Sequence, residues 1–189
     1  PDSFAMKCSC GSGMNYFVTD KSKEDKEKLR KLAAKWLKDD TGFSVGREWG
    51  YKNCRPRILF ERLLPRNERN DMPDYKFFCF YGKVYCLYKM VDYVDNHAKG
   101  RLAFYDRNFN KLPYYRQDYG HLTEEQEKPA CFEEMIKAAE ILSRDFPHVR
   151  VDFYDIGGRA VFGEMTFYNA CGFFRFEPDE FDFILGKQF

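Results

Sequence analysis

The sequence has 189 residues, of which 44% are hydrophobic and 19% are aromatic, so it can bury a core and is not a disordered chain. Its formal net charge of +1 argues against a general nucleic-acid-binding surface. No apolar run reaches the roughly 18 residues of a membrane span, and we expect no secretory signal. Seven cysteines without a disulfide-framework spacing favour a reducing cytoplasm.

The first part of the sequence predicts two short strands and a helix. Phe4 to Cys8 and Tyr16 to Val18 are the expected strands, on either side of a Gly/Ser loop. Residues 22–38 predict an amphipathic helix with Ser22 as its N-cap. Its apolar positions follow the i, i+3, i+4, i+7 rule and are Leu29, Leu32, Ala33, Trp36 and Leu37.

Next come a loop, a strand, a hinge and a hairpin. We expect residues 41–56 to form the loop and residues 57–64 the strand. Residues 65–73 are polar and bounded by prolines, which favours a hinge between lobes. Residues 74–93 predict two strands around a turn at residues 81–83.

The following segment predicts a short strand and a second helix. The strand begins at Arg101, and a long irregular stretch over residues 113–129 comes after it. Residues 130–146 predict the helix, whose buried side is expected to hold Phe132, Met135, Ile136, Ala139 and Leu142. Strands and helices arrive in clusters rather than in regular βαβ units, so the expected fold class is α+β.

Residues 148–167, HVRVDFYDIGGRAVFGEMTF, predict two strands around a Gly-Gly turn, with charges inside the apolar alternation. Arg150 and Asp152 share one strand face, and Glu164 lies on the return strand. The two acids face the same way if the loop has three residues, such as Ile156 to Gly158, whereas a two-residue turn without a bulge would separate them. Neighbouring carboxylates favour a bound cation, and oxygen ligands suit Mg²⁺. The alternative is an exposed face of solvated charges.

A lysine at the end of the first predicted strand is followed by two glycines. Lys7 precedes Gly11, Ser12 and Gly13 in KCSCGSG. Glycines let backbone N–H groups converge on a phosphate, and a lysine supplies the opposing charge. The order differs from that of a P-loop because the lysine comes first, so a plain hairpin turn is the alternative.

Two further lysines lie within predicted strands. Lys76 alternates with Phe78 and Phe80, so it shares their face and must find an anion or extend its ammonium group to water. Lys89, in CLYKM, is a second inward-facing candidate. Both are therefore candidates for binding an anionic group.

Two acids flank the predicted hinge, Glu61 before it and Asp74 after it. Backbone groups beside Glu61 would suit a purine edge, and Asp74 would suit ribose hydroxyls. Without further context, the simpler interpretation is that both are surface acids.

Cysteine or histidine catalysis is not predicted. Cys8 and Cys10 form half of a metal-binding pattern, but no matching Cys/His pair follows. His97, His121 and His148 are expected to be surface or loop residues.

These features follow one another in the order of the ATP-grasp superfamily: a lysine with a glycine loop, a glutamate at a hinge, an acid-x-lysine strand and an Asp…Glu hairpin. The sequence resembles the TupA-like branch of that superfamily, named for teichuronopeptide biosynthesis. The resemblance covers nearly the whole chain. Its most specific parts are DYKFFCF, residues 74–80, and VDFY with FGEMTF, residues 151–154 and 162–167.

The resemblance implies an ATP-grasp fold, in which two α+β lobes with antiparallel sheets sandwich a nucleotide site. Residues 1–64 would form the smaller, ATP-binding lobe with the glycine loop. Residues 65–189 would form the larger lobe with the metal-binding hairpin. We also expect the N-terminal lobe that precedes the lysine strand in this superfamily to be missing from the chain.

Nucleotide contacts are also implied by the resemblance. Lys7 and the Gly11-Ser12-Gly13 loop would contact the phosphates of ATP. Glu61, Arg62 and Leu63 would form the hinge that contacts the adenine.

Three residues on the strands after the hinge complete this set. Asp74 would bind the ribose. Lys76 and Lys89 would face the phosphates or the carboxylate of the substrate, where they would be catalytic residues together with Arg150.

On the hairpin, the resemblance makes Asp152 and Glu164 the ligands of one or two Mg²⁺ ions and Arg150 a positioning charge for an acyl phosphate. The wider superfamily commonly ends this motif Glu-x-Asn, whereas this sequence has Thr166 in the last position. A hydroxyl is a poorer Mg²⁺ ligand than an amide oxygen, so Asn169 is an alternative ligand.

The implied activity is an ATP- and Mg²⁺-dependent ligase that joins a carboxylate to an amine or another nucleophile through an acyl phosphate. For this branch, the resemblance suggests attachment of an amino acid to a cell-surface polysaccharide of the cell wall or capsule, or to its precursor. The enzyme would act in the cytoplasm beside polysaccharide-synthesis enzymes, without membrane insertion. Two alternatives are an ATP-dependent transferase or kinase acting on a sugar, and a non-catalytic nucleotide- or glycan-binding module.

Overall fold

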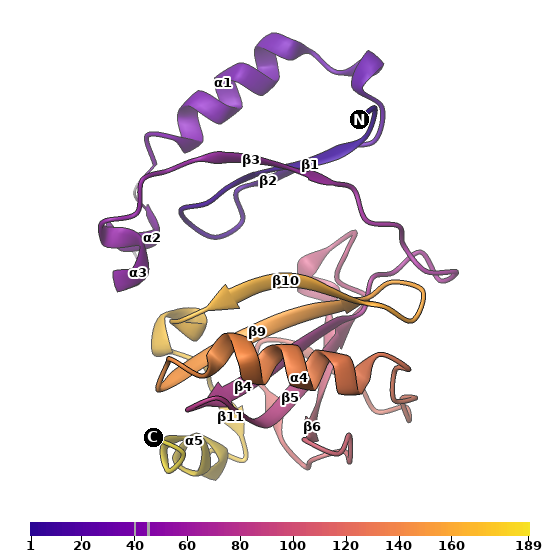
Figure 1. Cartoon of the computed structure of the whole chain (residues 1–189), viewed down its shortest axis with the longest axis vertical. Helices are drawn as coiled ribbons and strands as arrows, with labels where there is room; N and C mark the ends of the chain where they lie inside the picture. Colours follow the sequence, from indigo (N-terminus) through magenta and orange to yellow (C-terminus); the bar gives the residue numbers. More distant parts are fainter. Residues whose placement is uncertain (40, 45) are drawn as a thin grey trace. The chain divides into compact units, whose positions relative to one another are not determined.

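The chain divides into two units, Pro1–Leu64 and Pro65–Phe189, and the buried side chains of each unit pack among themselves. The structure is a computed structural model that describes residues 1–39, 41–44 and 46–189 (Figure 1). Each unit has its own apolar core.

The first unit is a three-stranded antiparallel sheet covered by a helix (Figure 1). The strand order is β2-β1-β3, with β1 in the centre. The elements are β1 (Phe4–Cys8), β2 (Asn15–Val18), α1 (Lys26–Trp36) and β3 (Ile58–Arg62). Trp36 of α1 is buried in one cluster with Met6 of β1 and Val18 of β2, so the predicted apolar stripe does hold the helix on the sheet.

Asp25, rather than the predicted Ser22, caps α1. Its carboxylate accepts hydrogen bonds from the backbone N–H groups of Glu27 and Lys28 at 2.8 and 3.2 Å. Ser22 lies earlier, in the 3₁₀ turn η1 (Lys21–Lys23). The prediction was wrong because Asp25 stands immediately before the first helical turn, where a short carboxylate reaches its free N–H groups.

The expected loop over residues 41–56 contains two one-turn helices, α2 (Thr41–Ser44) and α3 (Trp49–Lys52). Each is shorter than the window in which apolar periodicity can be recognised, so the sequence pattern missed them. Leu37, expected on the buried side of α1, lies just after the helix and is 43% exposed.

The second unit contains a six-stranded sheet in the order β10-β9-β4-β5-β6-β8. Neighbouring strands are antiparallel except β6 and β8, which are parallel. The strands are β4 (Asp74–Phe80), β5 (Lys83–Val91), β6 (Arg101–Asp106), β8 (Gly120–His121), β9 (His148–Asp155) and β10 (Ala160–Thr166). The two predicted hairpins, β4–β5 and β9–β10, are therefore confirmed.

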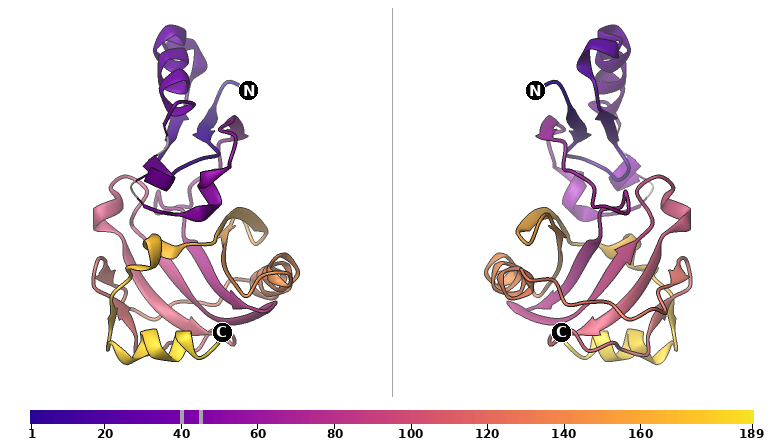
Figure 2. Two further views of the ribbon diagram at one scale, coloured as in Figure 1. Left: turned by 90° about the vertical axis from the view of Figure 1, so that its left-hand side faces the viewer. Right: turned by 90° about the vertical axis from the view of Figure 1, so that its right-hand side faces the viewer.

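Helix α4 (Phe132–Ser143) packs on one face of this sheet (Figures 1 and 2). Phe132, Met135, Ile136 and Ala139 are buried as predicted, but Leu142 is 38% exposed. Ser143 is buried instead, because it lies four residues after Ala139 and so directly above it on the helix.

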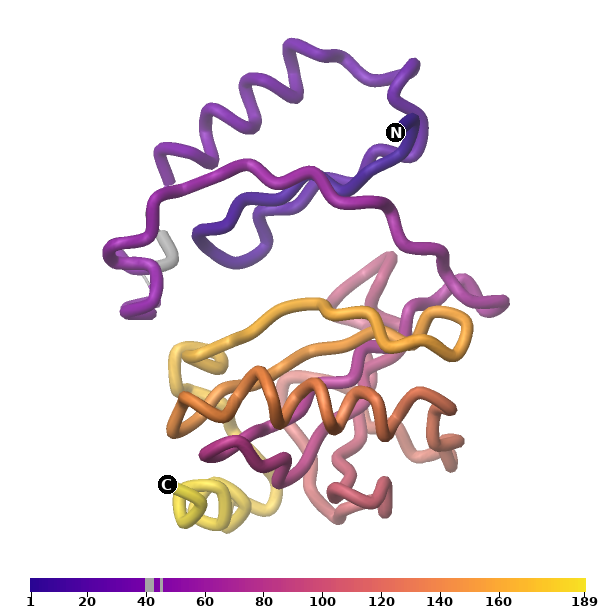
Figure 3. Tube along the Cα trace, viewed as in Figure 1, coloured from indigo at the N-terminus to yellow at the C-terminus, as the bar shows by residue number. Residues whose placement is uncertain are grey.

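The other face of the sheet has a second apolar core. It is covered by α5 (Glu180–Gly186) and by the ribbon of β7 (Tyr115–Arg116) and β11 (Phe176–Glu177). The sequence pattern predicted none of these elements. Figure 3 follows the chain from β10 through the short turn η3 (Asn169–Gly172) to α5.

Polar residues occupy one end of that second face. Along β4, Phe78 and Phe80 belong to the apolar core, whereas Asp74 and Lys76 lie beyond it on the same face. Lys76 stands opposite Asp152 of β9. Within the described ranges, no helix has the length and apolar composition needed to cross a membrane.

Candidate active site

A turn and a bulge set the register of the β9–β10 hairpin. Ile156 and Arg159 exchange backbone hydrogen bonds at 3.0 and 3.3 Å, which leaves Gly157 and Gly158 as a two-residue turn with φ of +61° and +79°. Positive φ at both positions is the geometry that lets a two-residue turn follow the twist of the strands. Of the two loop lengths considered from the sequence, the structure therefore has the two-residue turn.

With the two-residue turn alone, Glu164 would lie on the opposite face of the hairpin from Asp152. The bulge at Gly163 brings Glu164 back to the face of Asp152. The register shifts between Phe162 and Glu164, so that Glu164 stands directly opposite Asp152. A Cβ atom on Gly163 would lie 3.1 Å from the carbonyl oxygen of Asp152 and 3.2 Å from the ring of Tyr154, which explains the glycine. The two acids therefore share a face because the two-residue turn is combined with a bulge.

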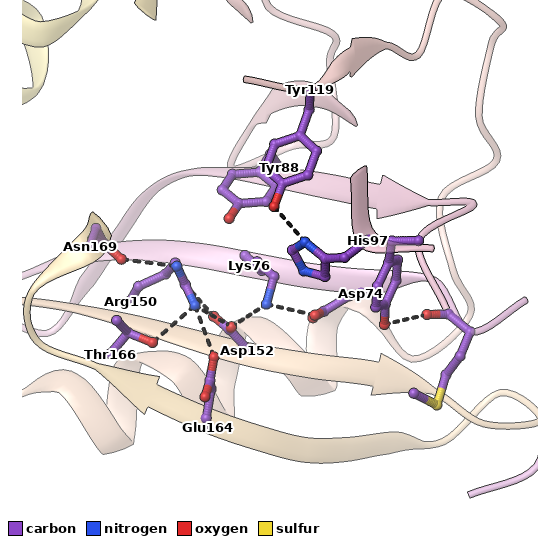
Figure 4. A network of polar contacts seen from close by, with 12 residues as sticks. Asp74, Lys76, Tyr88, His97, Tyr119, Arg150, Asp152, Glu164, Thr166 and Asn169 are labelled. Carbon is purple, nitrogen blue, oxygen red and sulfur yellow. Dashed lines mark hydrogen bonds and ion pairs between the residues drawn. The ribbon is translucent and has the colours of Figure 1, made fainter. Parts of the chain in front are cut away.

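Arg150 is the centre of the polar network (Figure 4). Its Nε and Nη2 donate to the two carboxylate oxygens of Asp152, each at 2.7 Å. Nη2 also lies 3.0 Å from Glu164 Oε1 and 2.9 Å from Thr166 Oγ1, and Nη1 lies 3.1 Å from Asn169 Oδ1. A bidentate pair of this kind fixes the plane of the guanidinium group.

Lys76 joins this network from the neighbouring strand. Its Nζ lies 2.5 Å from Asp152 Oδ2 and 2.6 Å from Asp74 Oδ2, as Figure 4 shows. Asp74 and Asp152 are 3% and 0% exposed, so the three groups are almost completely removed from water. The predicted anion for Lys76 is therefore supplied by the protein itself.

Burial and charge shift the pKa values of these acids in opposite directions. Burial alone would raise the pKa of Asp152, but Arg150 and Lys76 outweigh it and hold that pKa below its ordinary value. Burial raises the pKa of Asp74 to about 6, against the opposing charge of Lys76. Asp74 thus titrates closer to neutrality than an ordinary carboxyl group.

Asn169 and His148 extend the network to the edge of the sheet. His148 Nδ1 lies 3.0 Å from the carbonyl oxygen of Cys79, which can only accept, so Nδ1 carries the proton. Nε2 then accepts from Asn169 Nδ2 at 3.0 Å, and Asn169 Oδ1 is left to accept from Arg150. The ring of His148 also stacks on Phe80 at 4.5 Å. The expectation of a surface or loop histidine is wrong here, since His148 begins β9 beside a buried charge.

Sequence reasoning missed several residues of this face. Arg116 is 5% exposed, donates to the hydroxyl of Tyr88 at 3.0 Å and lies 3.8 Å from the ring centre of Phe174. The position of Tyr88 could have been predicted from the sequence, because Tyr88 stands opposite Lys76 on the second strand of the β4–β5 hairpin. Arg116 gave no such signal, because it comes from the irregular stretch before α4.

Lys89 lies on the opposite face of the sheet from Lys76. It stands opposite Tyr75 and is 8% exposed, with its Nζ 2.8 Å from Gln126 Oε1 and 5.5 Å from the centre of the Tyr75 ring. The structure confirms that Lys89 points inward but does not bring it to the network of Arg150.

Predicted nucleotide residues of the first unit lie around β1. Lys7 Nζ is 2.6 Å from Glu61 Oε2 across the β1–β3 pair. Gly11 and Gly13 adopt φ of +103° and +73° in the loop that joins β1 to β2. Ser12 and Arg62 are exposed and Leu63 is half-buried.

The described part of the chain contains no group of three or more His, Cys, Asp and Glu side chains that could hold a metal ion. Asp152 and Glu164 form a pair, and Thr166 and Asn169 direct their oxygens to Arg150. A metal ion at this hairpin would therefore depend on two carboxylates.

Comparisons with known proteins give one family and two similar solved structures. A search of proteins with curated descriptions gave no match. Two solved structures of the ATP-grasp ligase PsnB are similar. In its complex with minimal precursor, Mg and ADP, the identity is 15%, the TM-score is 0.46, and the match covers 98% of this chain and 46% of PsnB. With minimal precursor alone, the identity is 13%, the TM-score is 0.48, and the shares are 99% and 49%.

The chain thus spans about half the length of these PsnB chains. The family model for TupA-like ATP-grasp proteins matches residues 1–189, the whole of the sequence. This chain belongs to the TupA-like ATP-grasp family.

Proposed function

We propose that the chain provides the nucleotide and metal site of a ligase that uses ATP and Mg²⁺ to activate a carboxylate as an acyl phosphate. The observation that carries this proposal is the alignment of Asp152 with Glu164 across the bulge at Gly163, beside the fixed guanidinium group of Arg150. A bulge where a side chain would crowd its neighbours, set next to a buried charge network, supports a functional role for the hairpin.

The donor chemistry of the hairpin fits Mg²⁺. Carboxylate oxygens are its preferred protein ligands, and the ion takes its other ligands from water and substrate phosphates. Asp74, Asp152 and Glu164 oppose only Lys76 and Arg150, so the network has one negative charge in excess when all five are ionised. Glu164, with a side chain 61% exposed, is the accessible ligand, and Asp152 is the buried one. Bound there, Mg²⁺ would neutralise phosphate oxygens.

Arg150 and Lys76 supply fixed positive charge on the same face. Their partners hold them in place before any ligand arrives, which is the preorganisation that electrostatic stabilisation of a developing charge requires. We assign Arg150 to orienting the acyl phosphate and Asp74 to holding Lys76, since the Asp74 carboxylate is almost fully buried. A contact of Asp74 with ribose stays a prediction.

In the first unit, we propose that Lys7 and the Gly11–Gly13 loop bind the phosphates of the nucleotide. The backbone N–H groups of such a loop can converge on an anion. Lys7 is paired with Glu61 at a partly exposed position, so an incoming phosphate would compete with that carboxylate for its ammonium group. Glu61, Arg62 and Leu63 remain the proposed adenine segment.

The proposed reaction has two steps. The carboxylate attacks the terminal phosphorus of ATP and releases ADP, and an amine then attacks the acyl carbon and releases phosphate. We propose an amino acid and a cell-surface polysaccharide or its precursor as the two substrates, on the strength of the family alone. No side-chain nucleophile is needed, because positioning and charge neutralisation carry both steps.

Hydroxylamine tests this proposal without knowledge of the acceptor, because it traps an acyl phosphate as a hydroxamate. We expect hydroxamate and ADP in equal amounts when the chain is incubated with ATP, Mg²⁺, hydroxylamine and the correct amino acid from a set of twenty. A phosphorylated sugar formed from sugar acceptors, with no hydroxamate, would favour a kinase instead. Binding of ATP without either product would favour a nucleotide-binding module.

Glu164→Gln is the informative variant, and Glu133→Gln is its matched control. Both acids are exposed and ion-paired, with side chains 61% and 66% exposed, but Glu133 pairs with Lys128 away from the hairpin. We expect Glu164→Gln to lower hydroxamate formation by about 100-fold, which corresponds to about 2.7 kcal/mol. Equal activity of the two variants would contradict the metal assignment.

A further inference from the structure

Cys10 and Cys54 bring two thiols together in the first unit. They are 44 residues apart in sequence, and their sulfur atoms lie 2.7 Å apart. Hydrogen bonds next to each cysteine hold the two segments in place. The backbone N–H of Ser9 donates to the Arg57 carbonyl at 2.9 Å, and the Arg57 N–H donates to Ser9 Oγ at 3.0 Å. These bonds extend the β1–β3 pairing beyond the last strand residues.

A cavity gives access to this pair. It has a volume of about 290 Å³, and its lining includes both cysteines, apolar residues such as Leu37 and Phe43, and charged residues such as Lys38 and Lys52. Cys54 is half-buried and Cys10 is 6% exposed, so a small reagent would reach Cys54 first. Cys8, two residues before Cys10, faces the carbonyl oxygen of Trp36 instead.

We propose that Cys10 and Cys54 are a modification site that closes to a reversible disulfide under hydrogen peroxide. The Cys54 sulfur attacks the peroxide, which forms a sulfenic acid and releases one water molecule. The Cys10 sulfur then attacks the Cys54 sulfur, its proton leaves with the hydroxyl group as a second water molecule, and the S–S bond forms. Two thiols lose two electrons, and one peroxide is reduced to two waters.

The order of these steps follows from the surroundings of the two thiols. Burial, together with the hydrogen bond to Cys54, raises the pKa of the Cys10 thiol to about 11. Cys10 is therefore protonated at neutral pH and is disfavoured in the first step, whereas the more accessible Cys54 suits the first oxidation.

The disulfide would join the glycine loop to the segment before β3. Cys10 directly precedes Gly11, and Cys54 follows α3, so the bond would restrict the start of the loop. If the loop binds phosphates, oxidation would change nucleotide affinity, and this consequence rests on the proposed function. Formation of the disulfide does not depend on it.

Peptide mapping of the whole chain after peroxide treatment tests the proposal. We expect a Cys10–Cys54 linked peptide with a loss of two hydrogen atoms, which dithiothreitol reverses. Cys54→Ser should abolish the linked peptide. Cys171→Ser should retain it, because Cys171 is the other half-buried cysteine and lies in the second unit. Sulfenic or sulfinic acid on Cys54 beside a free Cys10 thiol, or a Cys8–Cys10 bond, would overturn the proposal.

A titration with a non-hydrolysable ATP analogue separates the two claims. Oxidised and reduced wild-type protein should differ in affinity by at least threefold, and the difference should vanish in Cys54→Ser. A mapped disulfide with equal affinities would leave the modification site intact and contradict its link to the glycine loop. Absence of the linked peptide would overturn the modification site whatever the nucleotide does.

Discussion

Lys76 and Lys7 are both strand lysines paired with carboxylates, yet their surroundings differ sharply. The side chain of Lys76 is 12% exposed between two buried acids, whereas Lys7 and Glu61 have side chains 33% and 46% exposed. The first arrangement is fixed by strand register and costs desolvation, so it requires every partner. The second is open to water and to an incoming anion. The hairpin network is therefore fixed by the fold, whereas the Lys7–Glu61 pair is accessible enough for the proposed ligand to rearrange it.

Removal of Asp152 should have the largest effect on stability. Asp152→Ala leaves Arg150 and Lys76 buried without their shared anion, so we expect the free energy of unfolding to fall by about 3–5 kcal/mol. Urea denaturation followed by circular dichroism measures it. A loss below about 1 kcal/mol would mean that water reaches the network, and it would contradict the contrast between the buried Lys76 and the partly exposed Lys7.

Asp74 should make stability depend on pH. Below about pH 3 its carboxyl is mostly protonated in both the folded and the unfolded chain. As pH rises toward 6 the unfolded chain releases this proton while the folded chain keeps it, because burial raises the pKa of Asp74 to about 6. Asp74 therefore costs stability as pH rises through this window, by up to roughly 3 kcal/mol.

Asp74→Asn should remove this pH dependence. The stability difference between wild type and variant should change between pH 4 and pH 7, whereas Asp95→Asn, in an exposed ion pair with Arg66, should change it little. Equal pH profiles for Asp74→Asn and wild type would show that the carboxyl titrates normally.

Gly163→Ala tests the bulge that aligns the two acids. Its Cβ would press on the Asp152 carbonyl and the Tyr154 ring, so we expect a loss of about 1–3 kcal/mol in the free energy of unfolding and displacement of Glu164. Gly186→Ala, where a Cβ meets nothing within 4 Å, is the control. Thermal melts and proton NMR of the hairpin measure both effects. Unchanged NMR shifts for Glu164 would contradict the role of the bulge.

Lys7→Met should have the smallest effect on stability and a clear effect on ligand binding. Its ion pair with Glu61 is partly exposed, so the free energy of unfolding should change by less than about 1 kcal/mol. Affinity for an ATP analogue should fall about tenfold, which corresponds to about 1.4 kcal/mol. Unchanged affinity would show that Lys7 does not contact the nucleotide and would favour the interpretation of the glycine loop as a plain hairpin turn.

Strand alternation predicted much of the site from the sequence. It placed Lys76 on the face of Phe78 and Phe80, and Arg150 on the face of Asp152, because side chains alternate with a period of two wherever a strand is regular. The same rule left the face of Glu164 open, since that face depends on both the turn length and the bulge, and a change in either one alone reverses it.

Contacts made outside regular elements were not predictable. Arg116 and the C-terminal elements come from irregular segments, and Asn169 reaches Arg150 from η3, where Ala170 and Cys171 have positive φ. The contact between Cys10 and Cys54 depends on how the segments continue past the paired strands. The positions of residues in irregular segments follow no repeating sequence pattern, so these contacts are seen only in the folded structure.

The most direct test of the hairpin site is calorimetric titration of the chain with a non-hydrolysable ATP analogue, with and without Mg²⁺, for wild type, Glu164→Gln and Glu133→Gln. We expect Mg²⁺ to strengthen binding to wild type and to Glu133→Gln by at least tenfold, and to have little effect on Glu164→Gln. Equal Mg²⁺ dependence in all three proteins would show that the aligned carboxylates do not hold the metal.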